Sequence, residues 1–186
     1  MENKVKEETV IVLDFLPNGY PFDKLPAHKK NPIIQAIGPE KFTLLELIPK
    51  KGVAAVAGEA IYIGEGKREK VHHISGRLAY SRLTSTARSE LQFVVKDCVE
   101  KRGQQFIGFI NKAQPMSTRI HQLELLPGLG KKHMWEIINA RDEKPFENFA
   151  DLKKRVHLLP DPVKIVIKRI LSEIEGKEKY RLFTEY

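Results

Sequence analysis

The sequence predicts an α+β fold, in which a small antiparallel β-barrel and an amphipathic helix precede a C-terminal region of short helices. Short β-branched and apolar runs, separated by glycine and proline turns, occupy the first sixty-odd residues. The apolar residues then recur at the three-to-four-residue spacing of helices. The 186 residues, 41% of them hydrophobic, suffice for two small domains, which we assign to residues 1–112 and 113–186.

The N-terminal part contains three runs with the composition of β-strands. Each is rich in β-branched residues or alternates apolar and polar ones, and each ends at a glycine or proline. These runs are residues 9–16, 41–48 and 59–63. The intervening residues 21–39 contain four prolines, which favours a long loop with at most a short strand at 33–37.

A single apolar stripe marks the amphipathic helix that follows. Thr84 or Ser81 can cap its start and Gly103 can end it. Because Cys98 lies on the stripe, we expect a buried thiol, and as the only cysteine it excludes a disulfide within the chain. The stripe consists of Leu83, Ala87, Leu91, Val94, Val95 and Cys98.

Four short helices are predicted beyond residue 117. Asn148 can cap the third of them, and Asp161 followed by Pro162 is a typical start for the fourth. An apolar face recurs through the fourth helix until Gly176. The predicted helices cover residues 118–125, 131–141, 149–156 and 162–174.

The formal net charge of +8 favours a polyanionic partner, although a charged surface that serves only solubility is the alternative. No apolar run is long enough to span a membrane, and the polar residues 1–8 lack the apolar core of a signal peptide, so we expect a cytoplasmic protein. The six histidines are scattered, and the adjacent His72 and His73 point to different faces of any regular element. We therefore expect no metal site and no other cofactor.

The segment with the most specific chemistry, residues 126–132 (LPGLGKK), lies between two predicted helices. Its proline ends the first helix, and two glycines permit positive φ and leave the backbone without Cβ atoms, while the leucine between them faces the core. The second helix then begins with free N–H groups beside two lysines, which favours a bound phosphate. The candidate contacts are Gly128, Leu129, Gly130, Lys131 and Lys132.

This segment resembles the helix-hairpin-helix family of nucleic-acid-binding motifs. The match covers residues 123–141 and consists of the apolar–Pro–Gly–apolar–Gly pattern followed by an amphipathic helix. In that family the hairpin amides grip the sugar-phosphate backbone, usually of DNA, without reading bases. The resemblance implies that Gly128, Gly130 and Lys131 contact the backbone, with Lys132 nearby. Use of the motif only as a scaffold or protein contact is the alternative.

Residues 149–174 look like a second copy of the motif, so the C-terminal region is expected to be a tandem helix-hairpin-helix. This copy departs from the pattern because Pro160-Asp161-Pro162 replaces the glycine-bearing hairpin. Proline has no N–H to offer, and the aspartate repels phosphate. We therefore expect the second copy to serve packing.

The whole chain resembles the DUF655 family of archaeal proteins. The resemblance rests on residues 58–64 (GEAIYIG) and 121–128 (HQLELLPG). It implies that the N-terminal barrel is OB-like, that the C-terminal region is helix-hairpin-helix, and that the protein binds nucleotides or nucleic acid. It implies no particular activity.

A second basic segment, residues 67–77, holds four fixed positive charges and two histidines. In an OB-like barrel, a loop of this kind can line the groove in which a single strand binds. Arg68, Lys70 and Arg77 are therefore secondary candidates for nucleic-acid binding. A solvated loop without a role is the alternative, because only Tyr62 and Tyr80 lie nearby to stack on bases.

We expect a sequence-nonspecific nucleic-acid-binding protein that grips the backbone of DNA or RNA and is not an enzyme. The sequence contains no P-loop, no nucleophile elbow and no zinc-protease helix motif. Two alternatives stay open. One is a protein-interaction scaffold associated with the transcription or translation machinery, and the other is a metal-dependent nuclease whose carboxylates meet only in the folded chain.

Overall fold

The computed structural model describes residues 7–24, 26 and 30–185, which form two compact units. Residues 1–6, part of the segment on which the expectation of no signal peptide rests, lie outside the described residues. Compact units need not be independently folding domains, so the domain boundary between residues 112 and 113 stays a prediction. Unit 1 comprises Met1–Val95, Ile174–Gly176 and Phe183–Tyr186, and unit 2 comprises Lys96–Glu173 and Lys177–Leu182.

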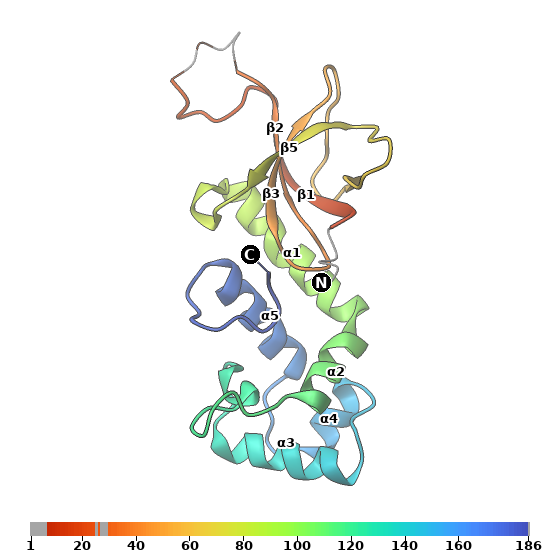
Figure 1. Ribbon diagram of the computed structural model, residues 1–186, viewed down its shortest axis with the longest axis vertical. Helices are drawn as coiled ribbons and strands as arrows, with labels where there is room; N and C mark the ends of the chain where they lie inside the picture. The colour runs from red at the N-terminus through yellow and green to blue at the C-terminus, as the bar shows by residue number, and fades with distance from the viewer. Residues whose placement is uncertain (1–6, 25, 27–29, 186) are drawn as a thin grey trace. The chain divides into compact units, whose positions relative to one another are not determined.

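Unit 1 is built on a five-stranded antiparallel sheet that curls into a half-barrel (Figure 1). The strand order is β4-β1-β2-β3-β5, so β4 and β5 form the two edges. The described residues form no ladder between these edges. The predicted barrel is therefore confirmed in its antiparallel pairing but not in its closure. The strands are β1 (Thr9–Leu16), β2 (Ile33–Ile37), β3 (Leu44–Pro49), β4 (Ala60–Tyr62) and β5 (Val71–Arg77).

One face of the sheet forms the core of unit 1. Alternate residues of a strand point to the same face, so the apolar residues of β1, β2 and β3 converge there. A bulge between Val12 and Asp14 shifts the register of β1 and pairs Asp14 with Gln35. The buried cluster comprises Val10, Val12, Ile34, Ala36, Leu45, Leu47, Ala55, Ile61, Ile63 and Val71.

Strand β5 was not predicted from the sequence. Residues 71–77, interpreted as part of a basic loop, pair with β3 along the edge of the sheet, where Ile74 lies opposite Leu47. Most side chains of this strand are exposed, so it lacks the apolar alternation on which strand prediction depends. The optional short strand at 33–37 is confirmed as β2.

Helix α1 (Ser85–Lys101) follows unit 1's sheet and contains the predicted apolar stripe except for Leu83, which precedes the helix, and all six stripe residues are buried. The N–H of Ala87 donates to Thr84 Oγ1 over 3.0 Å, which confirms Thr84 as the cap. Thr84 Oγ1 also donates to Asp14 Oδ2 over 2.5 Å, and the Thr84 N–H donates to Gln35 Oε1 over 3.0 Å. The start of the helix is thereby fixed to β1 and β2. Cys98 is buried, as expected.

The helices of unit 2 are short. Residues 103–112 form a helix that was not predicted from the sequence. The predicted helix at 118–125 is wrong in length, because only a 3₁₀ turn forms at its end. Within the described part of the chain, no helix is long and apolar enough to cross a bilayer. The elements are α2 (Gly103–Lys112), η3 (Gln122–Leu125), α3 (Lys131–Glu143), α4 (Phe149–Arg155) and α5 (Pro162–Ile174).

Candidate nucleic-acid interface

Residues 126–130, here called the first hairpin, connect η3 to α3. The Leu129 N–H donates to the Leu126 carbonyl over 3.1 Å, and both leucine side chains are buried. Gly128 has a φ of +82°, so it needs the conformational freedom of glycine. Gly130 does not, because its φ of −91° is open to any residue. The expectation that both glycines use positive φ is thus correct for Gly128 alone.

Helix α3 begins at the first hairpin without a side-chain cap. Gly130 occupies the N-cap position, where it has no side chain to accept hydrogen bonds, and the first helical bond runs from the Met134 N–H to the Gly130 carbonyl over 3.0 Å. Among the described residues, no acceptor pairs with the N–H groups of Lys131, Lys132 and His133. The helix therefore presents three free donors at its positive end.

The space in front of these donors is open. A Cβ atom placed on Gly130 would meet no atom within 4 Å, so the absence of a side chain there is not required by packing. Both lysines that follow are exposed, and the Lys132 side chain is 79% exposed. An anion can therefore approach the backbone closely between positive groups, as a phosphate requires.

One carboxylate, that of Glu136, would repel an anion bound at the start of α3. Glu136 lies one turn further along α3, with its Oε1 4.0 Å from Lys132 Nζ. Its Oε2 atom is buried and has no hydrogen-bond partner among the described residues. Glu136 was not among the residues predicted from the sequence, although its i+4 spacing from Lys132 is a signal that points to it.

The 3₁₀ turn before the first hairpin is closed at its start by a capping box. His121 Nδ1 accepts the Leu123 N–H over 3.1 Å, and Glu124 Oε2 accepts the His121 N–H over 2.9 Å. Burial, together with the positive charge of Arg141, lowers the pKa of His121. The imidazole is therefore neutral at pH 7, which is the state that can accept through Nδ1.

A buried arginine fixes the end of that turn. Arg169 on α5 is almost fully buried and forms an ion pair with Glu173 at 2.8 Å. Its Nη1 donates to the Leu125 carbonyl over 2.6 Å and to Glu178 Oε2 over 2.8 Å, and its Nη2 donates to the Tyr180 carbonyl. Leu125 immediately precedes the first hairpin, so these bonds attach the hairpin to α5 and to the segment that follows it.

Residues 156–161, the second hairpin, connect α4 to α5 and repeat the backbone pattern of the first. Leu158 has a φ of +54° and is 75% exposed, and it precedes the buried Leu159. In the first hairpin, Gly128 with positive φ precedes the buried Leu129 in the same way. A leucine therefore adopts a conformation that favours glycine, at a cost of about 1 kcal/mol or more.

The second hairpin differs in its N–H groups. Asp161 occupies the N-cap position of α5, and its Oδ1 accepts the N–H of Val163 over 3.0 Å and that of Lys164 over 3.3 Å. These are donors that a phosphate would need, and a carboxylate of the chain already holds them. The first hairpin leaves the corresponding groups of α3 free.

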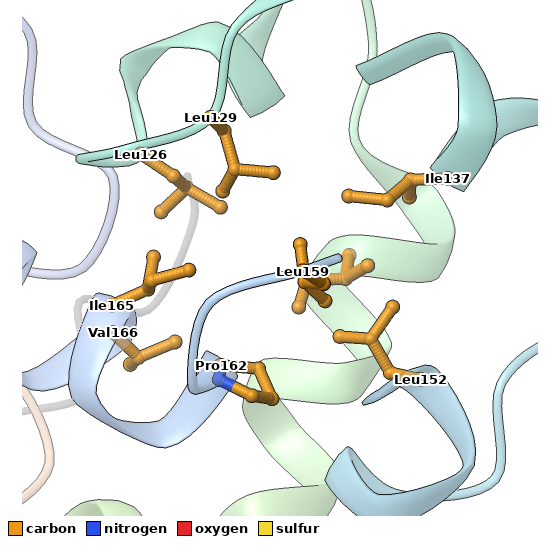
Figure 2. A pocket seen from close by; sticks show the side chains of 9 residues that line it. Leu126, Leu129, Ile137, Leu152, Leu159, Pro162, Ile165 and Val166 are labelled. Carbon is orange, nitrogen blue, oxygen red and sulfur yellow. The ribbon is translucent and has the colours of Figure 1, made fainter. Parts of the chain in front are cut away.

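Both hairpins contribute to one small apolar cavity, toward which their side chains point in Figure 2. Leu126 and Leu129 come from the first hairpin, and Leu159 comes from the second. The cavity has a volume of about 10 Å³, room for about one water molecule, so it offers no space for a small-molecule ligand. Its remaining lining residues are Ile110, Ile137, Leu152, Pro162, Ile165 and Val166.

The secondary candidates all belong to unit 1, whereas the first hairpin belongs to unit 2. Arg68 Nε donates to the Gly64 carbonyl over 2.9 Å, and Arg77 is exposed at the end of β5. Lys70 forms a hydrogen-bonded ion pair with Glu59, and the hydrogen bond from Lys70 lowers the pKa of the Glu59 carboxyl. Arg68 and Lys70 therefore already have partners within unit 1.

The positive charge of the chain is concentrated in unit 2. Unit 2 contains eighteen basic and eleven acidic residues, a formal net charge of +7, which leaves +1 for unit 1. Among the described residues, no three His, Cys, Asp or Glu side chains lie close enough together to hold a metal ion. The first hairpin thus lies on the strongly basic part of the molecule.

A known protein family matches almost the whole chain. The family model DUF655, described as a protein of unknown function, matches residues 6–185. The chain belongs to this family.

Two archaeal proteins are similar to this chain over most of its length. An uncharacterized protein of Methanocaldococcus jannaschii is 45% identical over 177 residues, which cover 94% of this chain and 78% of the relative. The crystal structure of Af1531 from Archaeoglobus fulgidus, also described as DUF655, superposes with a TM-score of 0.85 at 42% identity and covers 96% of this chain and 100% of that one. The α+β fold of this chain is therefore shared with Af1531.

Proposed function

We propose that this DUF655 protein binds nucleic acid without sequence preference, by holding a backbone phosphate at the first hairpin in the manner of a helix-hairpin-helix motif. The observation that carries the proposal is the uncapped start of α3, where free N–H groups and two exposed lysines surround a glycine without packing contacts. N–H groups and lysines there recognise phosphate and cannot distinguish bases. DNA and RNA share this group, so both are candidate ligands.

The second hairpin supports a tandem arrangement in which only one copy binds. Its backbone repeats the positive-φ residue and the buried leucine, but Asp161 occupies its amides. An aspartate at this position also repels a phosphate. We propose that this copy stabilises the first through their shared apolar core, leaving phosphate binding to Gly128–Lys132.

For unit 1 we propose an OB-like description. The support is its five short antiparallel strands, which curl into a half-barrel with exposed edges. Arg68, Lys70 and Arg77 remain secondary contacts in this proposal. Their contribution is expected to be smaller than that of the first hairpin, because Lys70 and Arg68 are held by Glu59 and Gly64.

The decisive variant is Gly130→Asp. The backbone of Gly130 suits any residue, open space surrounds it, and aspartate is a preferred N-cap, so the variant should fold at least as stably as the wild type. Its carboxylate should nevertheless occupy the free donors of α3 and repel phosphate. We expect binding of labelled duplex DNA, single strands and structured RNA to weaken at least tenfold in anisotropy at about 50 mM salt, and wild-type affinity to fall steeply by about 200 mM.

Asn148→Asp is the matched control. It adds the same charge at another N-cap in unit 2, where Asn148 Oδ1 already accepts the Asp151 N–H over 2.8 Å. We expect it to bind within about twofold of the wild type, the change that one distant surface charge produces. Equal weakening by both variants, or no wild-type binding at low salt, would refute the proposal and favour a protein partner. Cleavage that depends on a divalent metal would favour the nuclease alternative.

A further inference from the structure

Trp135 is a large aromatic side chain that the fold leaves in water. It is the only tryptophan of the chain and is 57% exposed, whereas its neighbours Met134 and Ile137 on α3 are buried. In the described part of the chain it has no aromatic or cation–π partner. Tryptophans are usually buried over most of their surface, so this one is available to a partner.

The position of Trp135 relates it to the first hairpin. It follows Lys131 by four residues, which is about one turn and roughly 6 Å of helical rise. Residues four apart lie on the same face of a helix, and side chains lean toward the N-terminus of their helix. From this helix geometry we expect the indole to lie over the first turn of α3, on the side that Lys131 occupies.

The charge around the indole indicates which partner fits. Two exposed lysines and three free N–H donors favour a polyanion. In a nucleic acid, each phosphate is joined to a sugar, and each sugar carries a base with a flat aromatic face. An exposed indole beside a phosphate site can stack on that base, provided the base is not already stacked within a duplex.

We propose that Trp135 stacks on an unpaired base of the strand whose phosphate lies at the first hairpin. This inference rests on the proposed function and extends it to the ligand class: single strands, frayed ends or bulges, in preference to intact duplex. Contacts to phosphate alone would hold single strands and duplex alike, because both have a charged backbone. Stacking adds affinity only where a base is free, by about tenfold for one base.

The test uses the intrinsic fluorescence of the wild-type chain together with anisotropy. Because Trp135 is the only tryptophan, its emission reports on this position alone. We expect a short single strand that cannot self-pair to quench the emission strongly at saturation, and a duplex of the same length to leave it nearly unchanged. Trp135→Ala should weaken single-strand binding about tenfold and leave duplex binding within about twofold.

Phe93→Ala is the matched control, because Phe93 is an aromatic residue that is 68% exposed on the part of α1 that belongs to unit 1. This variant should change neither the affinity for single strands nor the affinity for duplex. Unchanged tryptophan emission in the saturated single-strand complex would overturn the stacking proposal and leave the proposed function standing. Equal weakening of duplex and single-strand binding by Trp135→Ala would also overturn it. If the wild type binds neither form, both proposals fail, and Trp135 is then better explained as a protein contact.

Discussion

At the scale of single residues, the two hairpins differ most at the N-cap position of the helix that follows. Gly130 leaves the first donors of α3 free, whereas Asp161 accepts two of the corresponding donors of α5. Capping stabilises a helix by about 1 kcal/mol, so the first hairpin forgoes stability that a common residue would provide. That loss is explained if the ligand supplies the missing acceptor.

Removing the charge of Glu136 is predicted to strengthen nucleic-acid binding, whereas Gly130→Asp is predicted to weaken it. Its carboxylate lies 4.0 Å from Lys132 and opposes an incoming phosphate. A unit charge about 8 Å from a phosphate in water contributes about 0.5 kcal/mol. We therefore expect Glu136→Gln to bind nucleic acid about two- to threefold more tightly at low salt, and the gain to shrink as salt increases.

The measurement for Glu136→Gln is anisotropy at several salt concentrations. Folding should not suffer, because the substitution removes a charged group with a buried oxygen that lacks a partner. Unchanged or weaker binding would indicate that the phosphate does not lie near the start of α3. A comparable gain for Glu143→Gln, an exposed carboxylate at the other end of α3, would indicate a general charge effect instead.

At the scale of elements, the first hairpin depends on α5 for its position. Arg169 joins α5 to the Leu125 carbonyl and also pairs with Glu173, whose side chain is fully buried. We expect Arg169→Met to lower the free energy of unfolding by about 3–5 kcal/mol, because it leaves the Glu173 carboxylate without its cation. Urea denaturation followed by circular dichroism measures this change.

The double variant Arg169→Met/Glu173→Leu separates the cost of a buried Glu173 carboxylate that has lost the Arg169 cation from the cost of losing the other bonds of Arg169. It should recover a large part of the lost stability, since an apolar pair of similar volume often replaces a buried ion pair without loss. Nucleic-acid binding should be weakened in the folded double variant, because the Leu125 carbonyl beside the first hairpin has lost its Arg169 donor. A loss below about 1 kcal/mol for Arg169→Met would contradict this account of how the hairpin is held.

Elements with a clear apolar period could be predicted from the sequence, and those without one could not. The stripe of α1 and the caps Asn148 and Asp161 were local signals and are confirmed. Strand β5 was missed because an edge strand with exposed side chains has no apolar alternation. The helix predicted for residues 118–125 is wrong in its first half, because the chain turns back there with a bridge between Pro115 and His121.

The candidate site was predictable in its residues but not in its geometry. The pattern of residues 126–132 identified the hairpin, because glycine, proline and lysine have local effects. Which amides are free depends on the start of α3, and the positive φ of Leu158 arises from packing that residues distant in sequence determine. Neither property could be deduced from composition.

At the scale of the whole molecule, the charge is unevenly divided. Unit 2 carries +7 of the net +8, so association with a polyanion should be governed mainly by unit 2. The sequence showed the total but not this division, because the units separate inside α1, where no linker marks the boundary. Charge-changing substitutions in unit 1 are therefore expected to affect binding less than substitutions of Lys131 and Lys132 in unit 2.

The central claim is that the free amides at the start of α3, beside the first hairpin, hold a phosphate. An NMR titration of the ¹⁵N-labelled chain with a short oligonucleotide at low salt tests it most directly. We predict the largest amide shifts at Gly130, Lys131, Lys132 and His133, with small changes in the second hairpin, where Asp161 already holds the donors. Shifts confined to the region of Arg68, Lys70 and Arg77 in unit 1, with unchanged hairpin amides, would contradict the account.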